Sequence, residues 1–422
     1  MENKMDQLQG IDISDPRYFG EEYWTSPMNY LPEIHKDFPE SIEVYDVTLR
    51  DGEQSPGVCF NEDERVRIAE QFEEMGLKRI EIGMPVTSAS IGRAVSKLHQ
   101  RGTKLDLVAL CRANKTDIDM ALDMGCKSVI VEHSINPYLC KYGMGLEFEA
   151  LMDRLIPATS YAKEKGLNVN YFGWDAFRTS IPYIQKVFAT IVEQCHPDSV
   201  TVTDTVGTAL PETAKYVVQQ LKRAVGDTPV QFHGHNEFGL GTTAAIAAIQ
   251  GGASCVHTSM LGLGERTGNA PTEQVVMALE LLCNIRTGVD LSKIGPTARL
   301  VEVVSKQVTG DNMPIIGHNL SVQDSGLPAD LYLKLNEVGV KNAMRCFTPE
   351  LVGLPPMEYI LCKGAGKANI AYVMEKLGLD PSSLSKEQML AAVNAVKDES
   401  RIRKGAVDEQ TFAEMLKKIT QQ

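Results

Sequence analysis

The sequence lacks the cysteine patterns, apolar runs and basic tracts that mark several large classes of protein. Its nine cysteines are scattered, odd in number and never spaced as C-x-x-C, which disfavours both a disulfide framework and a zinc knuckle. No stretch approaches the roughly 18 consecutive apolar residues of a membrane span, and no long basic run accompanies the net charge of −13. A nucleic-acid surface is therefore not expected, because phosphate contacts need clustered Lys and Arg.

The remaining composition is that of an ordinary soluble globular protein. Apolar residues make up 43% and charged residues 23% of 422 residues, which is enough chain for one large domain and a smaller one. The first ten residues, MENKMDQLQG, are polar and lack the apolar core of a signal peptide. We therefore expect a cytoplasmic protein whose cysteines are reduced and mostly buried.

From residue 42 onward, short β-branched runs alternate with stretches of helical periodicity. The predicted strands are residues 42–49, 79–85, 104–111, 128–135, 168–174, 199–205, 230–236 and 255–262. Such alternation predicts a parallel sheet, and eight strand–helix units over roughly 245 residues match an α/β fold, the closed (β/α)₈ TIM barrel. A doubly wound open sheet is the alternative, and it is disfavoured because no G-x-G-x-x-G follows the first predicted strand.

We divide the chain into three parts on this basis. Residues 1–41 form an N-terminal arm, 42–286 the catalytic barrel, and 287–422 a linker with a smaller, mainly helical C-terminal region. The aromatic-rich arm is expected to pack on the body or on a neighbouring subunit. Within the last part, the Gly- and Pro-rich residues 287–370 are expected to be irregular, and residues 371–420 to form two or three short helices.

Polar residues gather after predicted strands one, six and seven, where the active site of a TIM barrel belongs. His233 and His235 are two apart on a strand, so both side chains lie on one face, ~6–7 Å apart. Two imidazoles and a carboxylate make a divalent-metal site with positions open for a substrate. The alternative is a pair of satisfied polar residues at the barrel mouth, but Arg50 and Asp51 on the same barrel favour the metal.

Asp51 is the best third ligand of such a metal. Arg50 is always protonated and cannot ligate, but it can hydrogen-bond a developing enolate oxygen as a fixed cation. The alternative for Arg50 and Asp51 is an exposed ion pair in a loop. The glycine-rich segment 262–269 can lie close to a ligand, and Asn269 can offer a carbonyl oxygen to a hard cation or merely cap a helix.

Four motifs together carry a resemblance to a known family. They are D-x-T-L-R-D-G-x-Q at 46–54, D-T-x-G at 204–207, H-x-H-N at 233–236 and G-x-G-E-R-x-G-N at 262–269. Their order and spacing resemble the isopropylmalate synthase and homocitrate synthase family. This family belongs to the metal-dependent barrels of the DRE-TIM metallolyase superfamily, with 3-hydroxy-3-methylglutaryl-CoA lyase and the transferase domain of pyruvate carboxylase.

The resemblance implies an activity and a role for each site residue. Asp51, His233 and His235 would hold Mg²⁺, Mn²⁺ or Zn²⁺, Arg50 would polarise the substrate carbonyl, and Gln54 and Thr205 would help to hold the substrate. The implied reaction is a Claisen condensation of acetyl-CoA with a 2-oxo acid, in which the acyl group becomes an alkyl group. The product is a 2-substituted malate, as in 2-isopropylmalate, homocitrate and citramalate synthases. The resemblance also implies a homodimer, with no nucleic-acid or membrane partner.

The sequence departs from the family where the base is expected. Trp174 stands in place of a catalytic Glu at the end of predicted strand five, and Pro328 in place of a C-terminal His. The possible substitutes are Asp175, Asp330, His133 and His318. These losses keep two alternatives open: a metal-dependent aldolase or lyase acting on a related 2-oxo or 3-hydroxy acid, and a non-catalytic homologue that binds metal or metabolite.

Predicted strand five also suggests the kind of substrate. By alternation, Asn170, Phe172 and Trp174 share the face on which homocitrate synthases carry Arg and Ser for 2-oxoglutarate. An aromatic lining suits an apolar substrate side chain, so a second dicarboxylate substrate is not expected.

Overall fold

The computed structural model describes residues 12, 14–342 and 344–421, which form two compact units. One unit comprises residues 28–309, and the other comprises the described residues of the first 27 together with those from 310 onward. None of the helices in the described chain is long and apolar enough to cross a membrane. All nine cysteines lie within the described residues and are free, and six of them are buried. The predicted boundaries after residues 41 and 286 stay predictions.

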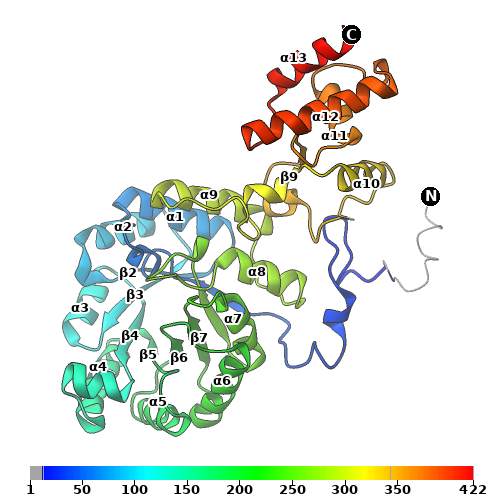
Figure 1. The fold of residues 1–422 in the computed structure, drawn as a ribbon. Coiled ribbons are helices and arrows are strands. Elements are labelled where there is room, and N and C mark those ends of the chain that lie inside the picture. Colours follow the sequence, from blue (N-terminus) through cyan, green and yellow to red (C-terminus); the bar gives the residue numbers. More distant parts are fainter. Residues whose placement is uncertain (1–11, 13, 343, 422) are drawn as a thin grey trace. The chain divides into compact units, whose positions relative to one another are not determined.

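The first unit contains a closed barrel of eight parallel strands, as predicted (Figure 1). The strands are β1 Glu43–Asp46, β2 Arg79–Gly83, β3 Asp106–Arg112, β4 Ser128–Ser134, β5 Asn168–Trp174, β6 Ser199–Asp204, β7 Val230–Gly234 and β8 Cys255–Thr258. Their order around the barrel follows the sequence, and β8 closes the barrel by pairing with β1. The C-terminal ends of all eight strands therefore meet at one mouth.

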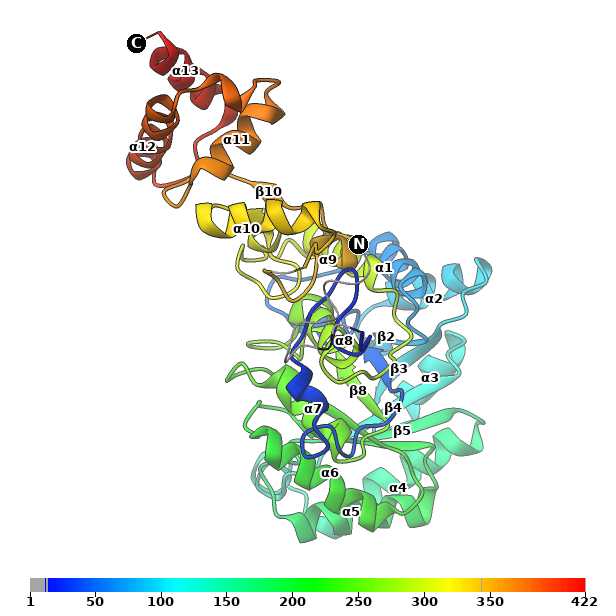
Figure 2. The same ribbon diagram turned by 90° about the vertical axis from the view of Figure 1, so that its right-hand side faces the viewer.

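Helices alternate with the strands and surround them (Figure 2). They are α1 Glu62–Glu74, α2 Ala89–Gln100, α3 Lys115–Asp123, α4 Phe148–Glu164, α5 Ile181–Cys195, α6 Pro211–Val225, α7 Gly241–Gln250 and α8 Thr272–Leu281. The first three begin with a side-chain cap: Asn61 and Glu64 form a capping box on α1, and Ser88 and Asn114 cap α2 and α3. Single-turn helices are η1 Pro27–Tyr30, η2 Gly52–Gln54, η3 Pro85–Thr87, η4 Leu139–Gly143, η5 Met260–Gly262, η6 Leu291–Lys293, η7 His318–Ser321, η8 Pro349–Val352 and η9 Pro381–Ser383.

The expectation that residues 287–370 are irregular is wrong for two segments. Helix α9 spans Ile294–Ser305 in the barrel unit, and α10 spans Gly326–Glu337 in the second unit. Each contains a proline, but Pro296 and Pro328 lie in the first turn, where a missing N–H breaks no helical hydrogen bond. The proline and glycine content of this stretch was therefore a poor guide to its structure.

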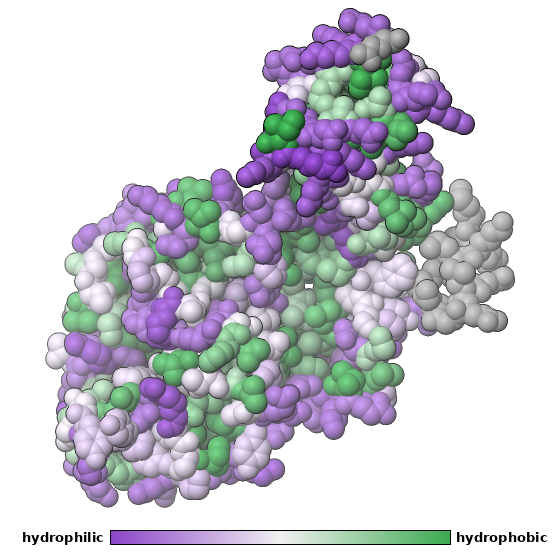
Figure 3. Space-filling view, viewed as in Figure 1, coloured by the Kyte–Doolittle hydropathy of each residue, from purple (hydrophilic) through white to green (hydrophobic). Residues whose placement is uncertain are grey.

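The second unit has its own small core. Helices α11 Lys367–Lys376, α12 Lys386–Arg403 and α13 Glu409–Thr420 bury a shared apolar cluster that includes Ile370, Val396 and Phe412. On the face seen in Figure 3, the surface over α12 and α13 is largely hydrophilic. Strands β9 Val322–Gln323 and β10 Glu358–Tyr359 form a short parallel pair. The three helices confirm the helical character predicted for residues 371–420.

The described residues of the N-terminal arm pack on the body, as expected. In the barrel unit, Gln250 at the end of α7 donates to the carbonyl of Ile34 at 3.4 Å, and Tyr30 donates its hydroxyl to the carbonyl of Leu281 at 3.0 Å. In the second unit, the amide of Trp24 donates to the carbonyl of Cys346 at 2.9 Å. Residues 1–11 and 13 lie outside the described residues.

A buried arginine on α1 ties the first helix to the barrel mouth. Arg65 is 1% exposed and donates to the carbonyls of Leu49 at 2.5 Å and Ile82 at 2.8 Å, and to the Glu53 carboxylate at 2.6 Å. These contacts span the segment after β1 and the end of β2. Arg65 therefore fixes the backbone on which Arg50 and Asp51 are carried.

Replacing this buried arginine is expected to destabilise the barrel. Arg65→Leu leaves two buried carbonyls and one carboxylate without their donor, which should lower the free energy of unfolding by about 3 kcal/mol or more. The midpoint of urea unfolding measures the change. The matched control is Arg93→Leu, whose side chain is 62% exposed in its ion pair with Glu62, and this variant should unfold at the wild-type midpoint. Equal midpoints for both variants would contradict the assignment.

Candidate active site

A pocket of about 580 Å³ opens at the C-terminal ends of the barrel strands. It is lined by Arg50, Asp51, Glu53, Gln54, Cys59, Met84, Thr87, Ser88, Leu110, Glu132, Phe172, Trp174, Thr203, Thr205, His233, His235 and Glu265. Six of the seven residues predicted for the site line this pocket, and Asn269 lies beside it, bridged through its backbone to His235. Below the pocket, an apolar cluster of Tyr45, Val108, Leu110, Ile130, Phe172 and Cys255 fills the barrel.

Asp51, His233 and His235 form a compact group of potential metal ligands. Their ligand atoms all lie within 4.8 Å of one another. The Asp51 Oδ2 atom lies 3.2 Å from His233 Nε2 and 3.7 Å from His235 Nε2, and the two Nε2 atoms are 3.3 Å apart. The two rings lean toward each other, so the Nε2 atoms lie closer than the strand spacing alone predicted.

The charge state of this group suits a cation. Burial lowers the pKa of His233, and it lowers the pKa of His235 to about 4, so both imidazoles are neutral at neutral pH. Burial opposes ionisation of Asp51, but the Arg50 charge and both histidines hold its pKa well below the usual range. One carboxylate and two neutral imidazoles converge here, and this donor set fits a divalent ion.

Asn269 offers a fourth donor beside this group. Its side chain is fully buried, and its amide nitrogen donates to the carbonyl of Leu263 at 2.9 Å. The amide oxygen Oδ1 is left buried without a hydrogen-bond partner, as is Asp51 Oδ1. The helix-cap alternative does not hold, because Pro271 is the N-cap of α8. A hard cation would satisfy both orphaned oxygens.

The loop after β8 orients His235 through its backbone. The Gly268 carbonyl lies 3.1 Å from His235 Nδ1 and accepts from the amide of Asn236 at 3.0 Å. This contact places the proton on Nδ1 and leaves Nε2 free as a ligand. Gly268 has φ +84°, and a Cβ there would overlap the Gly262 carbonyl oxygen. Only glycine therefore allows the loop to close tightly behind the histidine.

Arg50 is held in the pocket wall by two carboxylates. It contacts Glu81 on β2, lies 3.3 Å from Asp51, and donates to Gln54 at 3.2 Å. Its side chain is only 10% exposed, so the alternative of an exposed loop ion pair is wrong. Burial opposes the charge of Arg50, but Glu81 and Asp51 raise its pKa. Its Nη2 atom is buried and has no hydrogen-bond partner, so it remains available as a donor.

Three further polar residues at the mouth were not singled out in the sequence. Glu81 on β2 pairs with Arg50, Thr203 on β6 presents an unpaired buried hydroxyl, and Glu132 on β4 lines the pocket. The available signal was a single charged or polar residue at an inward position of an otherwise apolar strand, as in VIVEHS for Glu132.

The two proposed substitutes for the missing base that belong to the barrel unit do not line this pocket. Asp175 is 1% exposed, pairs with Arg178 at 2.6 Å and accepts from Asn136 at 2.8 Å. His133 alternates with the inward Glu132, and its Nδ1 lies 2.9 Å from the Ser134 carbonyl. Asp330 and His318 belong to the second unit, where Asp330 pairs with Lys334. Neither Asp175 nor His133 lines the pocket.

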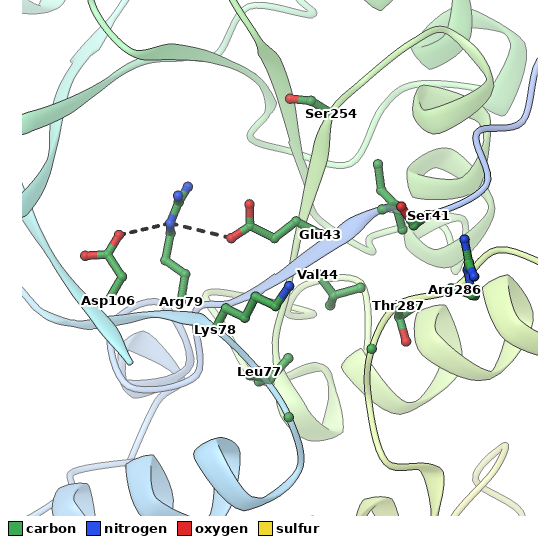
Figure 4. Close-up of a pocket in the computed structure, with 13 residues that line it drawn as sticks. Ser41, Glu43, Val44, Leu77, Lys78, Arg79, Asp106, Ser254, Arg286 and Thr287 are labelled. Carbon is green, nitrogen blue, oxygen red and sulfur yellow. Dashed lines mark hydrogen bonds and ion pairs between the residues drawn. The ribbon is translucent and has the colours of Figure 1, made fainter. Parts of the chain in front are cut away.

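A second pocket, of about 510 Å³, lies at the N-terminal ends of β1, β2 and β3 (Figure 4). Its central cation, Arg79, lies between two carboxylates, at 3.5 Å from Glu43 and 3.1 Å from Asp106. The Arg79 charge is thus paired within the wall. Since the N-terminal face of a TIM barrel serves stability, we assign this pocket a structural role.

Removing one histidine of the candidate metal group is expected to remove the metal. His235→Ala should weaken divalent-metal binding by more than about 100-fold, because even the loss of an outer partner of a ligand costs 10–100-fold. Elemental analysis and titration with Mn²⁺ would measure it. His133→Ala is the matched control, since its ring faces away from the pocket, and it should bind metal as the wild type does. Unchanged metal content in His235→Ala would rule out the assignment.

Comparison with known proteins agrees with the motifs and the fold. The HMGL-like family model matches residues 41–301. Homocitrate synthase AksA of Methanocaldococcus jannaschii is 32% identical, and the match covers 94% of this chain and 96% of that protein. The 2-isopropylmalate synthase of the same organism is also 32% identical, and the match covers 86% of this chain and 68% of that protein. HMG-CoA lyase of Bacillus subtilis shares the fold, with a TM-score of 0.58 and 21% identity over 64% of this chain and 95% of the lyase. The four motifs lie inside the matched region, and the chain belongs to the HMGL-like family.

Proposed function

We propose that this protein condenses an acyl-CoA thioester with a 2-oxo acid to form a 2-substituted malate. The carrying observation is the juxtaposition, in one pocket, of Asp51, His233 and His235 with the unpartnered Nη2 of Arg50. The family relatives named homocitrate and isopropylmalate synthase support the same reaction type. In this reaction the protein would act as an acyltransferase that converts the acyl group to an alkyl group on transfer.

The pocket supplies separate contacts for the two ends of a 2-oxo acid. A divalent cation held by Asp51, His233 and His235, with Asn269 alongside, would supply Lewis acidity toward the carbonyl and carboxylate oxygens. The Thr203 hydroxyl is unpaired and can donate to the substrate carboxylate. Thr205 lines the same wall, and its hydroxyl accepts from the amide of Asp175 at 2.8 Å, which leaves its own proton for the substrate. Gln54, which also lines the pocket, accepts a hydrogen bond from Arg50 at 3.2 Å and so helps to orient it.

Arg50 is the group that stabilises developing negative charge. Its Nε and Nη1 atoms are engaged by Glu81, Asp51 and Gln54, so the guanidinium cannot swing away. Nη2 can then donate to the oxygen that changes from carbonyl to alkoxide. Since the donor is fixed before the reaction, no reorganisation is needed as the charge develops.

Apart from Glu132, one wall of the pocket is apolar and suits an apolar substrate side chain. Leu110, Phe172 and Trp174 line it, with Met84 beside them. Among the described residues, no Lys or Arg other than Arg50 lines this pocket. A second carboxylate on the substrate would therefore face apolar side chains. The Arg50 side chain could not turn toward it, because Glu81, Asp51 and Gln54 already hold it.

The function is tested by measuring free thiol released when acetyl-CoA is mixed with a panel of 2-oxo acids. Apolar 2-oxo acids should give kcat/KM values roughly 100-fold or more above that of 2-oxoglutarate, because an unpaired carboxylate in an apolar wall costs several kcal/mol. Thiol release with no member of the panel, from folded and metal-loaded protein, would refute the condensation. Turnover of a 2-oxo or 3-hydroxy acid without any thioester would establish an aldolase or lyase instead.

Arg50→Lys separates the chemistry from metal loading. Lys keeps the charge but loses the planar fork, so kcat should fall by about 10²–10³ while metal content is unchanged. Arg112→Lys is the matched control, because Arg112 lies outside the pocket with its side chain 54% exposed, and it should keep wild-type kcat. Near-normal kcat in metal-loaded Arg50→Lys would show that Arg50 stabilises no transition-state charge.

A further inference from the structure

Trp174 occupies the position at which the family resemblance implies a catalytic Glu. Other residues of the pocket do carry carboxylates. Besides Asp51, the acidic residues that line it are Glu53, Glu132 and Glu265. Glu53 is committed to Arg65 at 2.6 Å and to the amide of Phe60 at 2.8 Å. Glu265 pairs with Arg266 at 3.0 Å. Glu132 alone among these has no hydrogen bond or ion pair with any residue that the structure describes.

The strand register directs Glu132 into the pocket. On β4, Ile130 belongs to the apolar cluster that fills the barrel, so Glu132, two residues further, lies on the same inward face at the mouth. Glu132 is paired in register with Phe172 on β5. Phe172 lies two residues before Trp174, on the same face of that strand. Its carboxylate therefore enters the pocket from the strand next to the one that carries the expected Glu in the relatives.

Glu81 is the other acidic residue near Arg50, and it cannot take this role. It is fully buried, it is held against Arg50, and it does not line the pocket. A base must reach the proton that it removes, and among these carboxylates Glu132 is both uncommitted and exposed to the pocket.

We propose that Glu132 is the catalytic base of the condensation, an inference that rests on the proposed function. Its carboxylate takes a proton from the methyl carbon of the acetyl thioester, and the electron pair of that C–H bond forms the enolate. The enolate carbon bonds to the 2-oxo carbonyl carbon, and the π pair of that carbonyl becomes an alkoxide beside Arg50. Glu132 returns the proton to the alkoxide. Water then cleaves the thioester to a carboxylate and the free thiol.

The electrostatic setting of Glu132 agrees with a group that accepts and returns one proton. Burial raises the pKa of Glu132 to about 7, with Arg50 acting to lower it and Glu81 and Asp51 acting to raise it. Proton transfer is most efficient when the pKa of the catalytic group lies near the working pH.

The direct test is exchange of the acetyl-CoA methyl hydrogens with D₂O, followed by mass spectrometry. The site is filled with a 2-hydroxy acid, which has the substrate skeleton but no electrophilic carbonyl. Wild-type protein should exchange the methyl hydrogens. Glu132→Gln should lose exchange and thiol release by about 10²–10⁴-fold, with unchanged metal content and unchanged 2-oxo acid binding by calorimetry. Glu193→Gln, on the exposed surface of α5, is the matched control and should exchange as the wild type does.

Glu132→Asp keeps the test decisive if Glu132→Gln does not fold. The shorter side chain retains the carboxylate but withdraws it, so exchange should be slowed at unchanged metal content. Exchange at the wild-type rate in either folded variant, with active wild-type protein, overturns the role of Glu132 and leaves the proposed function standing. Wild-type protein that neither exchanges nor releases thiol with any 2-oxo acid overturns both.

Discussion

The ion pair of Arg50 with Asp51 and Glu81 is the contact on which the rest of the active site depends. Two buried carboxylates share one guanidinium, so the cluster carries excess negative charge. The neighbouring imidazoles are kept neutral by burial and do not compensate it. Since buried charge is costly unless it is balanced, the mouth of the barrel is electrostatically incomplete without a cation, and the donor atoms converge where one would sit.

The framework that holds this cluster comes from parts of the chain far apart in sequence. Arg65 on α1 fixes the turn after β1, and Gly268 after β8 fixes the ring of His235. Closure of the barrel brings β1 and β8 together, so the Arg65 donor and the Gly268 carbonyl acceptor support the same site. Neither Arg65 nor Gly268 lines the pocket. Both nevertheless set the geometry of the candidate ligands, because they hold the backbone and the ring that present them.

Much of the fold and of the site was predictable from local patterns. Strand–helix alternation predicted all eight strands, because buried parallel strands are apolar runs bounded by turns. The convergence of strand ends then predicted that Arg50, Asp51, His233 and His235 meet. Helices α9 and α10 were missed, because their prolines lie in permissive first turns. Glu132 was missed although it interrupts the apolar run VIVEHS, because the sequence of β4 alone does not define which of its faces turns inward. The predicted homodimer stays a prediction.

The division of the N-terminal arm between the two units bears on how the chain folds during synthesis. Residues around Trp24 precede the whole barrel in the chain, but their partners near Cys346 and Phe347 follow it. The barrel can form in the interval, since its strands pair in chain order. The contacts of the arm with the second unit can form only after residues 346 and 347 have been synthesised, so the barrel is free to fold before them.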